Sequence, residues 1–314
     1  MFAISVWDTK ENKLTLIRDR LGEKPLYYGW QNNSFIFGSE LKSLQKFPGF
    51  RKDIDRGALA LYLRYNSIPA PHSIFKNIYK LSPGAMISVG LDLKENKEEF
   101  YWSTIEEANI GKRESFSGSY SSAVDALQFK LLDAVDSQMH ADVPLGAFLS
   151  GGVDSSAIVA LMQEQSSEKV KTFSIGFEEA EYNEAKYAKS VANHLGTDHH
   201  DMYVTSKDAL NVVPLLPDMF DEPFADSSQI PMYLVSKIAK SKVTVCLSGD
   251  GGDELFGGYN RYLVASKFWS KISNIPRPMR GGLAYLIKAV KPDTWDRISD
   301  LVYKDRYSGL GSKL

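Results

Sequence analysis

Short alternations of apolar and polar positions dominate the first hundred residues. Segments rich in Val, Ile, Phe, Tyr and Trp are separated by turn-forming spacers, a pattern that predicts short β-strands. The predicted strands are Phe2–Trp7, Lys13–Asp19, Pro25–Trp30 and Ser34–Ser39. A helix over Ala58–Tyr65 and a strand pair near Met86–Leu93 are predicted to follow. The front part is therefore expected to be antiparallel and β-rich.

The pattern changes between Ile105 and Tyr120. This stretch is polar and rich in Gly and Ser, and it has no periodic apolar face, so it predicts a linker over residues 105–120. A long surface loop within one domain is the alternative.

Helical and strand-like patterns alternate after residue 120. The predicted helices are Ala123–Met139, Asp154–Gln165, Glu184–Leu195 and Ile230–Ser241. The predicted strands are Leu145–Leu149, Val170–Phe177, Asp198–Val204 and Val243–Leu247. This alternation predicts a parallel sheet covered by helices on both faces. We therefore expect two domains, at 1–104 and 121–314.

Composition adds limits to this picture. The 314 residues are enough for two domains, and the net charge of −2 gives no reason to expect nucleic acid or an anionic membrane as partner. The apolar runs are too short to span a membrane, and no secretory leader is visible. The single cysteine, Cys246, fits a reducing, cytoplasmic location; a buried strand position explains it better than a nucleophile does.

A glycine-rich loop, Ser150-Gly151-Gly152-Val153-Asp154-Ser155-Ser156, joins a predicted strand to a predicted helix. Ligands of open α/β sheets bind beyond the carboxyl ends of strands, and a helix N-terminus attracts phosphate. Glycines let a phosphate approach the backbone, the serine hydroxyls can donate to it, and Asp154 is suited to hold Mg²⁺. The alternative is a Gly-Gly turn followed by a Ser or Asp helix cap.

A second loop, Ser248 to Tyr259, follows the strand Val243–Leu247 and carries Asp250, Asp253 and Glu254. Alone it could be a calcium site or a flexible turn. Because both loops follow strand ends, we expect them to converge, with Asp154 and Asp253 sharing Mg²⁺ and pyrophosphate.

The first loop resembles the SGGxDS loop of the ATP pyrophosphatase superfamily, and the pair resembles the asparagine synthetase family. The resemblance implies an adenine nucleotide alpha hydrolase-like domain that uses ATP and Mg²⁺. It implies nucleotide contacts from Leu149, Ser150, Gly151, Gly152, Asp154, Ser155, Ile175, Ser248 and Gly249, with Mg²⁺ held by Asp154 and Asp253.

The resemblance also implies a catalytic role for Asp250 in the attack of ammonia, where the family more often carries Glu. Residues 221–228 resemble a family segment that lines the same cleft; a surface loop with a helix cap is the alternative. A zinc site at His194, His199 and His200 is disfavoured, because the adjacent residues His199 and His200 are predicted to face opposite sides of a strand.

The front segment from Arg18 to Tyr28, predicted as a hairpin with a turn stiffened by Pro25, resembles the RDxxGxxPLYY stretch of N-terminal-nucleophile glutaminase domains. Phe37–Lys42 and Leu81–Ala85 continue the match. The resemblance implies that residues 1–104 are the C-terminal part of a type 2 glutamine amidotransferase domain. Since the nucleophilic cysteine and the glutamine-binding residues are not in this sequence, we expect a piece of a larger enzyme that lacks both ends; a naturally short relative is the alternative.

The resemblance as a whole implies ATP-dependent amidation of aspartate through a β-aspartyl adenylate, with glutamine or ammonia as nitrogen source. The alternatives are a glutamine-dependent amidotransferase for another carboxylate, such as a sugar acid, and an ATP-binding chain without catalysis. A homodimer is possible.

Overall fold

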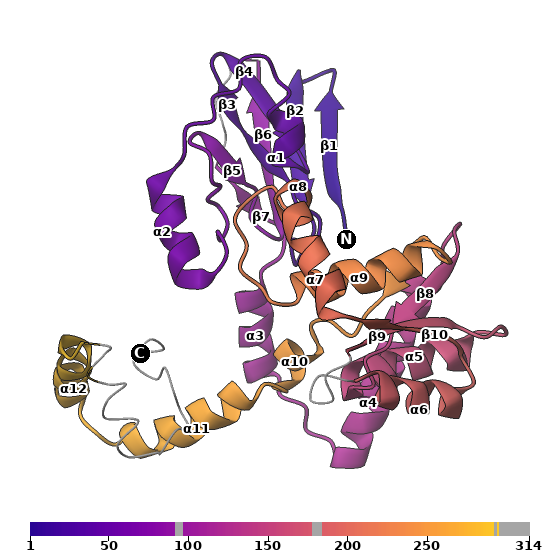
Figure 1. Ribbon diagram of the computed structural model, residues 1–314. Coiled ribbons are helices and arrows are strands. Elements are labelled where there is room, and N and C mark those ends of the chain that lie inside the picture. The colour runs from indigo at the N-terminus through magenta and orange to yellow at the C-terminus, as the bar shows by residue number, and fades with distance from the viewer. Residues whose placement is uncertain (92–96, 178–183, 292–293, 295–314) are drawn as a thin grey trace. The chain divides into compact units, whose positions relative to one another are not determined.

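The computed structural model describes residues 1–91, 97–177, 184–291 and 294. The chain divides into two compact units, Met1–Ser248 and a second that begins at Gly249 (Figure 1). Each unit is described by itself. No helix among the described residues is long and apolar enough to cross a membrane.

The front part of the first unit contains two antiparallel sheets. One has the strand order β1 (Ala3–Asp8), β2 (Lys13–Arg18), β6 (Ala85–Gly90), β7 (Glu99–Phe100). The other has the order β4 (Ser34–Gly38), β3 (Tyr27–Gln31), β5 (Ile78–Lys80). The four strands predicted before residue 40 are confirmed within two residues, and the predicted helix is α2 (Arg56–Tyr65). The helix α1 (Leu41–Leu44) and strands β5 and β7 were too short for the pattern to reveal.

The predicted hairpin around Pro25 is wrong. Strand β2 pairs with β1 and β6, whereas β3 pairs with β4 and β5, so the two strands lie in different sheets. A cluster that includes Leu16, Ile87 and Tyr28 draws side chains from both sheets. The segment between β2 and β3 passes from one sheet to the other, because each sheet buries its apolar face against the other. Of the strand pair predicted near Met86–Leu93, the structure contains β6, and residues 92–93 lie outside the described residues.

The stretch predicted as an irregular linker contains a helix, α3 (Thr104–Arg113). None of its residues is buried, which explains why an apolar period gave no signal. Local features favour it instead: Ser103 is the N-cap, Glu106 and Glu107 lie in the first turn, and Lys112 and Arg113 lie in the last. These charges complement the helix dipole. Residues 114–118 contain no helix or strand.

The predicted parallel sheet is confirmed. Its order is β10 (Asp198–Val204), β9 (Lys171–Phe177), β8 (Leu145–Phe148), β11 (Val245–Leu247), and every pairing is parallel. The predicted helices are α4 (Tyr120–Met139), α5 (Val153–Gln165), α6 (Ala185–Leu195) and α9 (Gln229–Lys240). Helix α6 ends at Gly196, whose φ of 73° is the left-handed cap expected of glycine.

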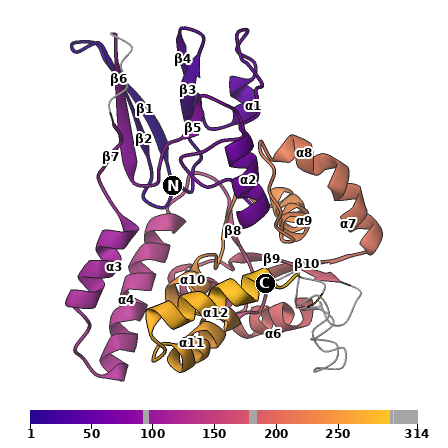
Figure 2. The same cartoon turned by 90° about the vertical axis from the view of Figure 1, so that its left-hand side faces the viewer.

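Helices cover both faces of this sheet, as Figures 1 and 2 show. On one face, α4, α5 and α6 contribute residues such as Val135, Val159 and Ala188 to a common apolar cluster. On the other face, Val235 and Ala239 of α9 pack with Phe173 of β9. A short helical stretch, α7 (Ser206–Val212), η2 (Val213–Leu215) and α8 (Leu216–Met219), connects β10 to the segment that precedes α9.

The second unit contains three described helices. They are α10 (Gly252–Phe256), α11 (Asn260–Ile272) and α12 (Arg277–Ala289). The first of them, α10, lies within the second glycine-rich loop, Ser248 to Tyr259.

Candidate active site

The first glycine-rich loop is held in shape by its own serines. The hydroxyls of Ser150 and Ser155 are 2.9 Å apart, and the Ser150 hydroxyl accepts a bond from the Gly152 amide at 3.2 Å. The buried Ser155 hydroxyl also donates to the Gly152 carbonyl at 3.3 Å. Ser155 therefore fixes the loop between β8 and α5; its predicted contact with phosphate stays a prediction.

Gly151 is the position in this loop that only glycine can occupy. Its φ is +83°, a conformation that other residues adopt at a cost. A Cβ here would also lie 2.6 Å from the backbone nitrogen of Ala188 and 2.7 Å from the carbonyl carbon of Tyr187, both in α6. The loop thus lies directly against the α6 backbone.

Helix α5 begins with unoccupied amide donors. Its N-cap is Gly152, and no side chain caps it, so the alternative of a Ser or Asp helix cap is wrong. An α-helix leaves its first amides without intrahelical partners, and these amides and the helix dipole attract an anion. Asp154 lies in the first turn, where its carboxylate would repel phosphate unless a cation stood between them. The donor set fits a phosphate accompanied by Mg²⁺.

A pocket of about 200 Å³ opens beside this loop. Leu149, Ser150 and Ile175, which the sequence pointed to independently, all line it. Its other walls come from β8, β9, α9 and the residues that precede α6 and α9: Phe148, Phe173, Ser174, Glu184, Ser228, Pro231, Met232 and Val235. The α9 residues carry no motif, and the helical apolar period of α9 was the one available signal for them. The pocket is mainly apolar and suits a flat ring beside the first glycine-rich loop.

The second loop begins at the end of β11, which lies beside β8 in the sheet. Ser248 therefore follows a strand adjacent to the one that ends at the first loop. Within the second unit, Gly251 has a φ of +89° and precedes α10, whose first turn carries Asp253 and Glu254. Asp250 and Gly249 belong to the same short turn, in which the Gly252 amide donates to the Gly249 carbonyl.

Packing and hydrogen bonds constrain the two acidic side chains of α10. A Cβ on Gly258 would overlap the carboxylate of Asp253, so this glycine makes room for that side chain. Tyr259 donates a hydrogen bond of 2.7 Å to Glu254, and this bond lowers the pKa of the Glu254 carboxyl. The approach of Asp253 to Asp154 stays a prediction, because the two residues belong to different units.

The histidines and the cysteine have structural partners. His199 Nδ1 lies 2.9 Å from the Thr172 hydroxyl, whereas the ring of His200 stacks on Phe173, so the two side chains face opposite sides of the sheet as predicted. Burial raises the pKa of Cys246 to about 11, which argues against a thiolate nucleophile at this position.

The segment 221–228 is not a simple surface loop. Asp221 accepts the Leu41 amide at 2.6 Å, and Glu222 accepts the Ile74 amide at 2.7 Å. Ser228, at the other end of the segment, lines the pocket beside the first glycine-rich loop. The sequence indicated the cleft but gave no signal for the contacts with the front part of the unit.

The charged motif near Arg18 has a structural role. The guanidinium of Arg18 donates to the carbonyls of Gly22, Lys24 and Leu81, and it is buried. The carboxylate of Asp19 accepts the amides of Phe2, Glu23 and Lys24. The hydrogen bonds of Arg18 and Asp19 fix the turn after β2, and the bond from Arg18 to Leu81 joins this turn to the loop that precedes β6.

Comparison with known families agrees with this geometry. The family model described as "Asparagine synthase" matches residues 126–309, and the model described as "Glutamine amidotransferase domain" matches residues 1–102. The chain belongs to the asparagine synthase family. It thus combines two domains, one with antiparallel sheets and one with a parallel sheet.

Three relatives illustrate the similarity. A protein of Methanocaldococcus jannaschii, named provisionally as asparagine synthetase [glutamine-hydrolyzing] 2, is 41% identical over 84% of this chain and 50% of its own length. Asparagine synthetase [glutamine-hydrolyzing] 1 of Bacillus subtilis is 37% identical over 83% of this chain and 40% of its own. Asparagine synthetase B [glutamine-hydrolyzing] of Escherichia coli is 28% identical over 82% and 43%. The chain spans about half the length of the curated relatives that it matches.

Proposed function

We propose that the chain carries the ATP site of a glutamine-dependent asparagine synthetase. The observation that supports this most is the pocket lined by Leu149, Ser150 and Ile175, which opens beside an uncapped helix N-terminus in a member of the asparagine synthase family. In this proposal the domain from residue 121 onwards has the ATP pyrophosphatase fold. Residues 1–104 are part of a glutaminase domain of the N-terminal-nucleophile type.

The chemistry follows from the need to activate a carboxylate. The side-chain carboxylate of aspartate attacks the α-phosphorus of ATP, the bond to the β-phosphate breaks, and pyrophosphate leaves. Ammonia then attacks the adenylate carbonyl, and AMP leaves with the oxygen, giving asparagine. Amides of the first turn of α5 would hold the departing pyrophosphate and stabilise its growing charge.

Individual residues have distinct proposed roles. Leu149 and Ile175 would pack against the adenosine, Ser150 and Gly151 would approach the phosphates, and Ser155 would hold the loop. Ser248 and Gly249 would contact the nucleotide from the second loop. Asp250 would assist the attack of ammonia.

Mg²⁺ would be held by Asp154 and Asp253 and would neutralise charge on the pyrophosphate. Glutamine as nitrogen source is proposed for the whole protein. The raised pKa of Cys246 and its half-buried place in the parallel sheet argue against a role as the glutaminase nucleophile. We also propose a cytoplasmic location, which is supported by the use of ATP and by a single cysteine.

The exchange of labelled pyrophosphate into ATP tests the substrate. We expect exchange in the presence of aspartate and Mg²⁺, and none when aspartate is withheld. Exchange that does not depend on aspartate, or that a sugar acid supports better, would favour the other amidotransferase class. Saturable ATP binding with no exchange under any condition would favour the non-catalytic alternative.

A further inference from the structure

The segment from Asp218 to Ser228 joins two parts of the first unit that have different proposed functions. At its start, Lys42 donates to the carbonyls of Asp218 and Met219, and Asp221 accepts the amides of Leu41 and Lys42. At its end, Ser228 lines the pocket beside the first glycine-rich loop. We call residues 218–228 the strap.

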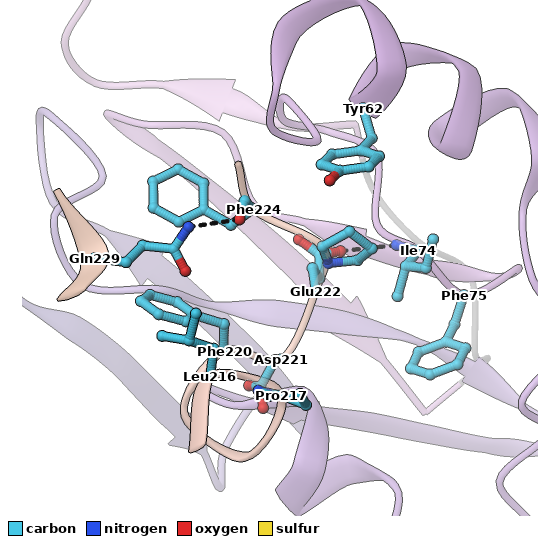
Figure 3. A pocket seen from close by; sticks show the side chains of 11 residues that line it. Tyr62, Ile74, Phe75, Leu216, Pro217, Phe220, Asp221, Glu222, Phe224 and Gln229 are labelled. Atoms are coloured by element: carbon cyan, nitrogen blue, oxygen red, sulfur yellow. Dashed lines mark hydrogen bonds between the residues drawn. The ribbon is translucent and has the colours of Figure 1, made fainter. Parts of the chain in front are cut away.

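Glu222 is the most buried anchor of the strap. Its side chain is 9% exposed and forms an ion pair with Lys80, whose side chain is 15% exposed. Its other oxygen accepts the Ile74 amide at 2.7 Å (Figure 3). The Tyr27 hydroxyl donates at 3.4 Å to the Glu222 oxygen that pairs with Lys80. Removing one partner of such a buried pair leaves the other charge without compensation, so the geometry is strongly enforced.

The chain between the last anchor and the pocket is short and internally bonded. The Ala225 amide donates to the carbonyl of Asn66 at 2.8 Å, and only two residues separate Ala225 from Ser228. The Ser228 amide donates to Asp226 at 2.8 Å. The side-chain amide of Gln229 donates to the carbonyls of Phe224 and Asp226 at 2.7 and 2.9 Å. These bonds make the turn stiff, so a displacement at Glu222 reaches Ser228.

The strap also has room to move. One side of it, together with Tyr62, Ile74 and Phe75 of the front part, encloses a pocket of about 450 Å³ (Figure 3). A segment packed on all sides would have one position only, because protein interiors are close-packed. Here polar contacts, rather than close packing, hold the strap at one distance from the front part: the Glu222–Lys80 ion pair, the bonds of Asp221 and the Ala225–Asn66 bond.

We propose that Glu222 and Lys80 are positioning residues that set the place of Ser228 in the nucleotide pocket, so that the front domain and the ATP site influence each other. This inference rests on the proposed function, since it assumes that the pocket binds ATP. Coupling between two sites is reciprocal: what the front part does to ATP affinity, ATP binding does to the front part.

A double-mutant cycle tests the proposal. The dissociation constant of Mg-ATP is measured by isothermal titration for the wild type, E222Q, S228A and the double variant. We expect E222Q to weaken binding at least fivefold, and to weaken it by less than twofold when Ser228 is already Ala. Independent, multiplicative effects in the cycle would overturn the proposal, because Glu222 would then not act through Ser228.

Asp53→Asn is the matched control. It breaks the ion pair of Arg51 and Asp53, which lies in the same front part but whose side chains are 70% and 51% exposed. We expect its affinity for Mg-ATP to stay within twofold of the wild type. An equal loss in D53N and E222Q would show that any lost ion pair in the front part suffices, and would contradict the specific role.

A second measurement needs no variant and remains valid if E222Q does not fold. The amides of Leu41 and Ile74 donate to the strap carboxylates, so their hydrogen exchange in the wild type reports its position. We expect Mg-ATP to slow their exchange at least fivefold. Saturable ATP binding with unchanged exchange at both amides would overturn the inference alone, whereas no ATP binding at all would refute the proposed function itself.

Discussion

At the scale of single residues, the shape of both glycine-rich loops depends on positions that leave no room for a side chain, as well as on hydrogen bonds. Gly151 is forced by its φ of +83° and by the α6 backbone, and Gly258 is forced by the side chain of Asp253. Both glycines stand in motifs that the sequence revealed. The motif gave the residue type in both cases. The reason for Gly151 lies in α6, which the local sequence does not show, whereas the reason for Gly258 lies in Asp253 of the same loop.

His199 gives the first prediction, a pH dependence of stability. Burial lowers the pKa of His199, while the nearby Asp201 raises it and His200 and Lys189 lower it further. Because its pKa is lower in the folded state than in the unfolded state, His199 binds a proton more tightly when the chain is unfolded. The pKa of histidine in the unfolded chain is about 6.5. The contribution of His199 to stability is therefore present above that pH and is lost as the pH falls below it.

Urea unfolding at pH 7.5 and pH 5.5 checks this. We expect the wild type to lose more stability between the two pH values than His199→Gln, which keeps hydrogen-bonding groups near Thr172 and Ser174 but does not titrate. Equal losses in the two proteins would show that the protonation of His199 does not matter.

At the scale of elements, apolar periodicity predicted most of the second domain. Strands β8 to β11 and helices α4, α5, α6 and α9 alternate as expected, because each buries one face against the sheet. Apolar periodicity did not predict helix α3, because none of its residues is buried. The Ser103 cap and the charged residues in its first and last turns favour the helix instead. Apolar periodicity missed the turn near Pro25 too, because local sequence does not show which sheet a strand joins.

Capping gives an element-scale prediction in the front part. The carboxylate of Asp55 caps α2 by accepting the amides of Gly57 at 2.7 Å and Ala58 at 3.1 Å. We expect Asp55→Ala to lower the free energy of unfolding by about 1 kcal/mol, as measured by urea denaturation. Asp55→Asn, which can still accept both bonds, should retain most of the stability. A D55A protein as stable as the wild type would show that α2 needs no cap.

At the scale of the whole molecule, the long-range polar contacts could not be predicted from the sequence. Asp221 and Leu41 are 180 residues apart, and Glu222 and Ile74 are 148 apart. The acidic pair of the strap was visible as letters of a motif, but its partners include backbone amides, which carry no sequence signature, and side chains that are distant in sequence, such as Lys80. The parallel pairing of β8 with β11 places Ser248, where the second loop starts, beside the end of β8, where the first loop starts. That the rest of the two loops meet stays a prediction.

Ligand binding should stabilise the folded chain. A ligand that binds only the folded state at about 100 times its dissociation constant adds about 2.7 kcal/mol to the free energy of unfolding. We expect Mg-ATP to give this increase in urea unfolding followed by far-ultraviolet circular dichroism. Removal of Mg²⁺ by EDTA should abolish most of it. An equal increase with and without EDTA would contradict a role for the metal.

The most direct test of the central claim is the titration of Mg-ATP into the wild type and Gly151→Ala. We expect saturable binding at one site in the wild type and an affinity at least tenfold lower in G151A, because the methyl group collides with α6 and displaces the first glycine-rich loop. Gly111→Ala, in the exposed helix α3 with nothing near its Cβ position, should bind as the wild type does. Equal affinities in the wild type and a folded G151A would contradict an ATP site at this loop.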